Sequence, residues 1–181
     1  GSLELLKNTK MELGINNSWS GSCAYGSGSS AGVHDGRINT IVENGEPDIV
    51  IIYLGTNDCA TGYTVEQFGG AINTMIEKVN ALTDADIFLM TLGYSEYKGM
   101  SYNEANRLAY NEKLRAIATE QNCGIIPLDE YVVEDNCSIY LADNLHYNTK
   151  NHFLKVLLVK LLQQLMVRVL ISGLMLLIIY S

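Results

Sequence analysis

Basic residues are scarce in this chain of 181 residues. Twelve lysines and arginines stand against 20 aspartates and glutamates, which gives a formal net charge of −8 and a pI near 4.8. Proteins that bind nucleic acid neutralise phosphates with clustered Lys and Arg, and the sequence has no such cluster. We therefore expect no nucleic-acid partner.

Motifs for metals and for dinucleotides are missing as well. Cys23, Cys59, Cys123 and Cys137 show neither a CxxC pair nor a Cys/His spacing typical of zinc sites. No Gly-x-Gly-x-x-Gly follows an apolar run, so a dinucleotide fingerprint is absent. The sequence therefore predicts no metal and no cofactor, and it leaves the disulfide state and the cellular compartment open.

Long uncharged apolar runs are also lacking, although the end of the chain comes close. Residues 144–181 contain four bases and no acid, and the last 13 residues carry no charge. A helix that spans a membrane needs about 20 apolar residues, so a membrane span is not expected. The sequence instead predicts that residues 166–181 form a buried strand or helix, or a carboxy-terminal segment foreign to the fold.

The chain does contain apolar runs that alternate with amphipathic segments. Ile49–Leu54 is an unbroken apolar run between turn residues, which is typical of a strand buried on both faces. Thr64–Leu82 has apolar residues at helical spacing behind the N-cap residue Thr64. The other expected elements are a helix over Leu3–Leu13 that ends at Gly14, a short strand at Ile15–Asn17, a helix over Arg37–Asn44, a strand over Asp86–Leu92, a helix over Asn103–Gln121 and a strand over Gly124–Leu128. This alternation predicts an α/β fold, a three-layer αβα sandwich around a parallel sheet.

A first candidate motif directly follows the run Ile49–Leu54. In an open parallel sheet, ligands bind at the carboxyl ends of the strands. The sequence Gly55-Thr56-Asn57-Asp58 stands at such an end, where the amide of Asn57 can donate to developing negative charge. The alternative is a turn in which Asn57 and Asp58 bond the local backbone.

A second candidate motif places Asp143 three residues before His146. At this spacing the carboxylate can bind Nδ1 of the imidazole and fix its tautomer, which leaves Nε2 free to act as a base. The alternative is that Asp143 caps a turn while His146 packs against the protein.

These motifs together resemble the conserved blocks of the SGNH (GDSL-type) hydrolases. Pro47–Asp58 is similar to the third block of that family, Asp143–Asn148 to the last block, and Asn17–Ser22 to the second block, whose glycine is Gly21 here. Their order and separations fit over residues 3 to about 165. The resemblance implies a flavodoxin-like αβα sandwich that hydrolyses esters by Ser-His-Asp chemistry.

The resemblance also implies roles for individual residues. His146 corresponds to the general base and Asp143 to the carboxylate that orients it. The backbone N–H of Gly21 and the side-chain amide of Asn57 correspond to donors of the oxyanion hole. The implied substrate is a small-molecule or carbohydrate ester, with an acyl or acetyl group.

The chain departs from the family at its first block. No apolar strand followed by Gly-Asp-Ser precedes Gly21, and Ser2 has no preceding strand to hold it at the sheet. We therefore expect residues 1–165 to form an SGNH-hydrolase-like domain without its first strand, and this chain to be inactive as it stands. We further expect Val167–Gly173 in the apolar tail to form a strand that fills the vacant central slot, with Ser172 as a candidate nucleophile.

A noncatalytic carbohydrate-binding or interaction domain that keeps the fold is the alternative function. The absence of Gly-Asp-Ser favours it, whereas the paired Asp143 and His146 favour an esterase. The sequence does not predict an oligomeric state.

Overall fold

The computed structural model describes residues 12–16, 21–26, 38–43, 45–97, 102–143, 145–147 and 175–180. Residues 3–11 of the helix predicted over Leu3–Leu13 lie outside these ranges, as does the predicted nucleophile candidate Ser172.

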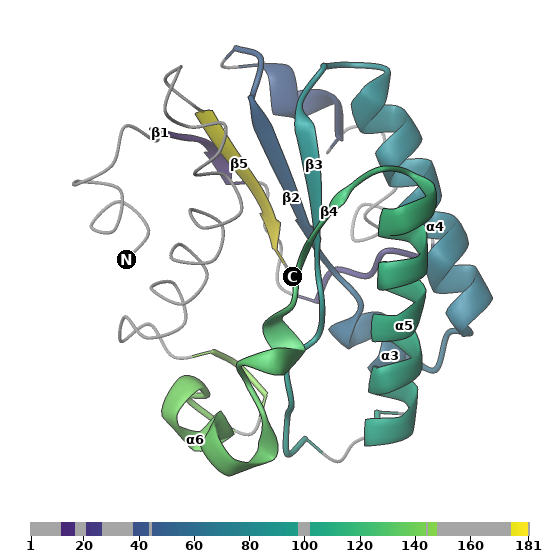
Figure 1. Cartoon of the computed structure of the whole chain (residues 1–181), viewed down its shortest axis with the longest axis vertical. Helices are drawn as coiled ribbons and strands as arrows, with labels where there is room; N and C mark the ends of the chain where they lie inside the picture. Colours follow the sequence, from purple (N-terminus) through teal and green to yellow (C-terminus); the bar gives the residue numbers. More distant parts are fainter. Residues whose placement is uncertain are drawn as a thin grey trace.

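A five-stranded parallel sheet forms the centre of the described structure (Figure 1). The strands lie in the order β1-β5-β2-β3-β4. Their bounds are β1 Glu12–Asn16, β2 Ile49–Tyr53, β3 Asp86–Met90, β4 Gly124–Ile126 and β5 Met175–Tyr180. This parallel sheet with flanking helices confirms the predicted α/β class.

The strand β5 fills the slot between β1 and β2. Leu176 pairs with Ile49 of β2 and with Leu13 of β1, and Tyr180 at the end of β5 pairs with Tyr53. A strand from the tail was predicted for this slot at Val167–Gly173; the strand that fills it is Met175–Tyr180, and residues 167–173 lie outside the described ranges.

Two long helices cover one face of the sheet (Figure 1). Helix α4 spans Val65–Asn80 and begins with a reciprocal cap, in which Thr64 Oγ1 accepts from the Gln67 N–H at 3.1 Å and the Gln67 side chain accepts from the Thr64 N–H at 2.9 Å. Helix α5 spans Glu104–Glu120 and is capped by Asn103. Both helices confirm their predicted positions, and no described helix is long and apolar enough to cross a membrane.

The shorter elements lie at the ends of the strands and helices. They are η1 Asn39–Val42, α3 Thr56–Thr61, η2 Leu128–Glu130, η3 Glu134–Asn136 and α6 Cys137–Tyr140. The helix predicted over Arg37–Asn44 is only a short 3₁₀ turn. The strand β1 already begins at Glu12, so the prediction of a helix that ends at Gly14 is wrong, because pairing with β5 outweighs the local helical pattern.

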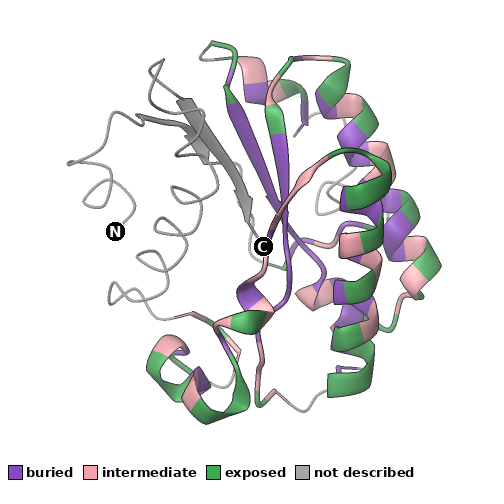
Figure 2. Ribbon diagram, viewed as in Figure 1, coloured by how far each residue is buried: buried purple, intermediate pink, exposed green. Residues whose placement is uncertain are grey.

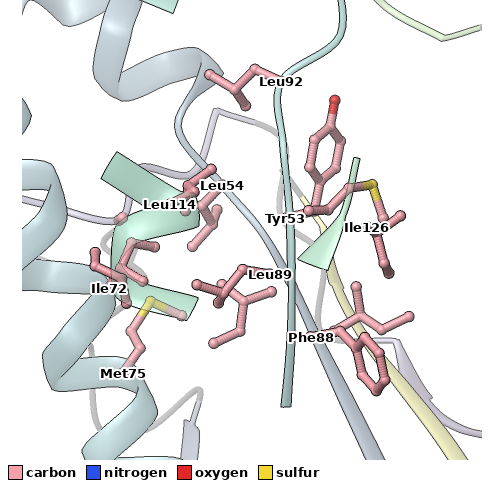
Figure 3. Close-up of a cluster of buried hydrophobic side chains, with 14 of the residues drawn as sticks. Tyr53, Leu54, Ile72, Met75, Phe88, Leu89, Leu92, Leu114 and Ile126 are labelled. Carbon is pink, nitrogen blue, oxygen red and sulfur yellow. The ribbon is translucent and has the colours of Figure 1, made fainter. Parts of the chain in front are cut away.

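The core lies between the sheet and the helices α4 and α5 (Figure 2). The strand β2 is buried along its whole length, as its unbroken apolar run predicted. Figure 3 shows Leu54, Leu89 and Leu114 together with Ile72 and Met75 of α4 on the helix side of β3. Burial of this kind contributes about 25 cal/mol for each Å² of apolar surface and fixes the strand ends that carry the polar motifs.

Candidate active site

The chain turns sharply where β2 ends. Gly55 has a φ of 126°, a conformation that favours glycine, and a Cβ there would lie 3.1 Å from the ring of Phe68. Helix α3 begins at the next residue, so Asn57 and Asp58 lie in its first turn. The alternative of a purely local turn is wrong, because both side chains bond backbone atoms more than thirty positions away.

Asn57 contacts the segment that carries Gly21. Its Nδ2 donates to the carbonyl oxygen of Ser22 at 3.1 Å. A side-chain amide has two N–H groups, so the second N–H remains for a ligand. Gly21 precedes Ser22, is exposed, and has a φ of 78° with open space around it. The structure therefore brings the segments of the two predicted oxyanion donors together.

Asp58 lies fully buried beneath the same segment. Its Oδ2 accepts from the N–H of Ala24 and its Oδ1 from the N–H of Tyr25, both at 2.8 Å. Burial raises the pKa of Asp58 to about 6, against the opposing effect of these two N–H donors. Sequence reasoning considered Asp58 only as a turn residue, since nothing in the sequence indicated its distant partners.

Asp143 and His146 make the predicted pair. Asp143 Oδ2 lies 2.9 Å from His146 Nδ1, while Asp143 Oδ1 accepts from the N–H groups of Leu145 and His146 at 2.8 and 2.6 Å. These bonds lower the pKa of Asp143 to about 2, with the His146 N–H as the largest cause. The carboxylate thus caps a turn and also orients the ring. The His146 side chain is 72% exposed, so the alternative of a packed histidine is wrong.

Tyr147 fixes the segment that carries Asp143 and His146, called the histidine loop below, to the strand ends. Its ring centroid lies 6.4 Å from that of Tyr53, the last residue of β2. Its hydroxyl lies so close to Gly93, which follows β3, that a Cβ there would be only 2.6 Å away. The His146 carbonyl also accepts from the Ala142 N–H at 2.7 Å. The loop therefore lies at the same edge of the sheet as Asn57, the edge at which α3 and α6 appear in the lower part of Figure 1.

Two side chains of helix α5, Arg107 and Asn111, bond the backbone of Leu92 just after β3; these bonds are called the clamp below. Asn111 Oδ1 accepts from the Leu92 N–H at 2.7 Å, and Asn111 Nδ2 donates to the Leu92 carbonyl at 2.9 Å. Arg107 donates to the same carbonyl and forms an ion pair with Glu104. Both Arg107 and Asn111 are buried. Sequence analysis missed this clamp, because polar residues of an amphipathic helix are expected to face solvent.

The cysteines are free thiols in the described structure. Burial raises the pKa of Cys23 to about 11 and also raises the pKa of Cys59, so both remain protonated at neutral pH and are poor nucleophiles. Within the described ranges, no cluster of three or more His, Cys, Asp or Glu could hold a metal ion. The polar groups that the described structure brings to this edge are the imidazole of His146, its carboxylate partner Asp143 and the amide of Asn57.

Solved structures share this fold at low sequence identity. A psychrotrophic esterase EstA from Pseudoalteromonas sp. aligns with a TM-score of 0.65 and 20% identity over 85% of this chain and 78% of its own. A carbohydrate esterase family 3 protein from Talaromyces cellulolyticus aligns at 0.59 and 22% over 81% and 69%. A lipase/acylhydrolase from Enterococcus faecalis aligns at 0.58 and 18% over 80% and 72%. At these identities the likeness concerns the fold alone.

The sequence match is more specific. None of the curated proteins matches this chain. The profile of the GDSL-like lipase/acylhydrolase family, however, matches residues 5–152, a span that contains Gly21, Asn57, Asp143 and His146. The chain therefore belongs to the GDSL-like lipase/acylhydrolase family.

Proposed function

We propose that this chain carries the base and the oxyanion donors of an ester-hydrolase site for small acyl esters, including acetyl esters of carbohydrates. His146 is the general base, Asp143 orients it, and Asn57 with the N–H of Gly21 stabilises the oxyanion. The observation that carries the proposal is the 2.9 Å contact of Asp143 with His146 Nδ1 on a loop that Tyr147 fixes at the edge where Asn57 lies. Membership of the GDSL-like lipase/acylhydrolase family supports an ester substrate.

The proposed reaction follows from the tautomer of His146 that the Asp143 contact favours. With Nδ1–H donated to Asp143, the lone pair of His146 Nε2 takes the proton of a serine hydroxyl as its oxygen attacks the acyl carbon. The negative charge on the acyl oxygen is stabilised by Asn57 and Gly21, and each such donor is worth about 3 kcal/mol, or about a hundredfold in rate. The imidazolium then protonates the leaving alcohol, and water activated by His146 releases the acid.

The proposed reaction needs a serine nucleophile. The sequence has no Gly-Asp-Ser, so we expect no turnover by the chain as it stands. The carboxyl end of β5 pairs with the end of β2, because Tyr180 lies opposite Tyr53, four residues before Asn57. A Gly-Asp-Ser placed directly after Tyr180 is therefore expected to present a serine at the edge that holds the candidate site.

A minimal variant tests this proposal. Insertion of Gly-Asp between Tyr180 and Ser181 creates Gly-Asp-Ser after β5. We expect this variant to hydrolyse p-nitrophenyl acetate, and the same insertion with Ser181→Ala or His146→Ala to be inactive. Turnover that persists in the His146→Ala form contradicts the proposed role of the base.

The missing Gly-Asp-Ser also favours a second candidate, a noncatalytic carbohydrate-binding domain. That function predicts saturable binding of acetylated xylo-oligosaccharides by calorimetry, with no turnover after the insertion. Turnover that depends on His146 excludes it.

A further inference from the structure

We infer that Asp58 is a positioning residue that holds the oxyanion loop, defined here as Gly21–Gly26, in its working conformation through its ionised carboxylate. The catalytic consequence rests on the proposed function, whereas the structural effect on the loop does not.

The geometry comes from two neighbouring residues of α3. Asp58 uses one oxygen for the N–H of Ala24 and the other for the N–H of Tyr25, each at 2.8 Å. Asn57 holds the carbonyl of Ser22 at 3.1 Å. The loop is therefore bonded at three residues to the first turn of α3, directly after Gly21. If the two N–H bonds of Asp58 are lost, the loop keeps the bond from Asn57, the side-chain hydrogen bond between Cys23 and Thr61, and the ring contact of Tyr25 with Tyr63 at 5.0 Å. None of these contacts holds the N–H groups of Ala24 and Tyr25.

The carboxylate has no counter-ion among the described residues. The titratable groups on which the Asp58 charge acts are Cys23 of the loop, Cys59 of α3 and Tyr110 of α5. Burial raises the pKa of all three groups, so they are neutral near pH 6. The backbone N–H groups of Ala24 and Tyr25, with the N–H of Asp58 itself, stabilise the charge. Burial raises the pKa of Asp58 to about 6, and no cation among the described residues offsets this effect.

Protonation changes what this side chain can bind. An ionised carboxylate only accepts hydrogen bonds, whereas a protonated carboxyl has one O–H that must itself donate. In the described geometry each oxygen accepts from an N–H donor, so the oxygen that takes up the proton becomes a poorer, uncharged acceptor and its bond to the loop weakens. The loop is therefore expected to loosen as the pH falls from 7 to 5.

Amide hydrogen exchange followed by NMR tests this inference on the intact chain without any activity. The protection factors of the Ala24 and Tyr25 amides, each corrected for its intrinsic exchange rate, are measured from pH 7.5 to pH 4.5. The Leu92 amide is the internal control, because it donates to the neutral amide oxygen of Asn111 at 2.7 Å. We expect protection of one or both loop amides to fall about tenfold to a hundredfold around pH 6, the loss that a buried charge-assisted hydrogen bond implies. Protection of Leu92 should not change.

The Asp58→Asn variant separates positioning from packing. Asparagine has nearly the same shape but only one acceptor oxygen, so the variant should lose protection at one loop amide at every pH and show no step at pH 6. Asp84→Asn, in the exposed turn after α4, is the matched control. Equal protection in wild type and Asp58→Asn, or no step at pH 6 in the wild type, overturns the inference. The wild-type titration decides the question if Asp58→Asn does not fold.

Activity provides the second readout. In the variant with Gly-Asp inserted before Ser181, Asp58→Asn should lower kcat about tenfold to a hundredfold with little change in KM, because oxyanion donors act in the transition state. Absence of turnover in the insertion variant itself contradicts the proposed function and leaves the exchange result standing. Turnover that Asp58→Asn does not change overturns the catalytic consequence of the inference.

Discussion

Replacement of Asn111 by alanine should destabilise the protein by about 3 kcal/mol. The side chain makes two buried hydrogen bonds to Leu92, at 2.7 and 2.9 Å, and it is almost fully buried. Loss of the bond to the carbonyl costs about 1 kcal/mol, and the buried Leu92 N–H left without an acceptor costs about 1–3 kcal/mol. The Leu92 carbonyl keeps its bond from Arg107, so the cost falls mainly on the Leu92 N–H.

Urea unfolding followed by circular dichroism measures this loss of free energy. Thermal unfolding gives a second measurement: at about 2–4 °C for each kcal/mol in a chain of this size, the melting temperature should fall by about 6–12 °C. Glu112→Ala, at the neighbouring exposed position on α5, should stay within about 0.5 kcal/mol of the wild type. A loss below about 1 kcal/mol for Asn111→Ala would refute the reasoning, because it would mean that Leu92 finds another acceptor when the clamp is removed.

Three further outcomes follow from the described contacts. The pKa of Asp58 is raised to about 6, against 3.8 in the unfolded chain, so the folded state keeps the proton of this carboxyl up to a higher pH. Its contribution to the free energy of unfolding should therefore fall by about 3 kcal/mol as the pH rises from 4 to 6, and the fall should be absent in Asp58→Asn. Asp143 acts oppositely, since its lowered pKa gives stability that is lost only as the pH falls from 4 towards 2. Gly93→Ala should cost about 1–3 kcal/mol in urea unfolding, because its Cβ meets Val132 at 2.8 Å and Tyr147 at 2.6 Å. The control Gly70→Ala, in open space on α4, should stabilise the protein by up to about 1 kcal/mol. A Gly93→Ala variant as stable as the wild type contradicts the packing described for Tyr147. Ile178→Pro should abolish cooperative thermal unfolding, because it places a proline in the strand between β1 and β2. Ile178→Val should lose at most about 1.5 kcal/mol, and a cooperative transition in Ile178→Pro would show that β5 is dispensable.

The sequence predicted the elements whose signals are local. The run Ile49–Leu54 and the helix behind Thr64 lie where expected, because burial on both faces and a reciprocal cap leave patterns within one segment. The pairing of Asp143 with His146 was also predictable, since three residues of chain bring the two groups together.

Features that depend on distant partners were not predictable from one sequence. The bonds from Asp58 to Ala24 and Tyr25 span more than thirty residues, and Asn111 of α5 bonds the backbone of Leu92, which follows β3. The tail strand was expected in the correct slot over Val167–Gly173, whereas Met175–Tyr180 fills that slot. Its register is set by pairing with both neighbours, and the apolar tail offers several segments of similar β-propensity.

The two parts of the candidate site are held in physically different ways. Buried hydrogen bonds fix the oxyanion loop at the exit of β2, and packing of Tyr147 on Gly93 fixes the histidine loop at the exit of β3. The pair of Asp143 and His146 is exposed, at 59% and 72% of the two side chains, so water and salt screen its Coulomb attraction. The orientation of the imidazole must therefore come mainly from the turn, in which one carboxylate oxygen accepts from the Leu145 and His146 N–H groups while the other meets Nδ1. Under the proposed function, a substrate that covers this loop would exclude water from the pair, and the attraction between the carboxylate and the developing imidazolium would then strengthen at the moment when the proton is transferred.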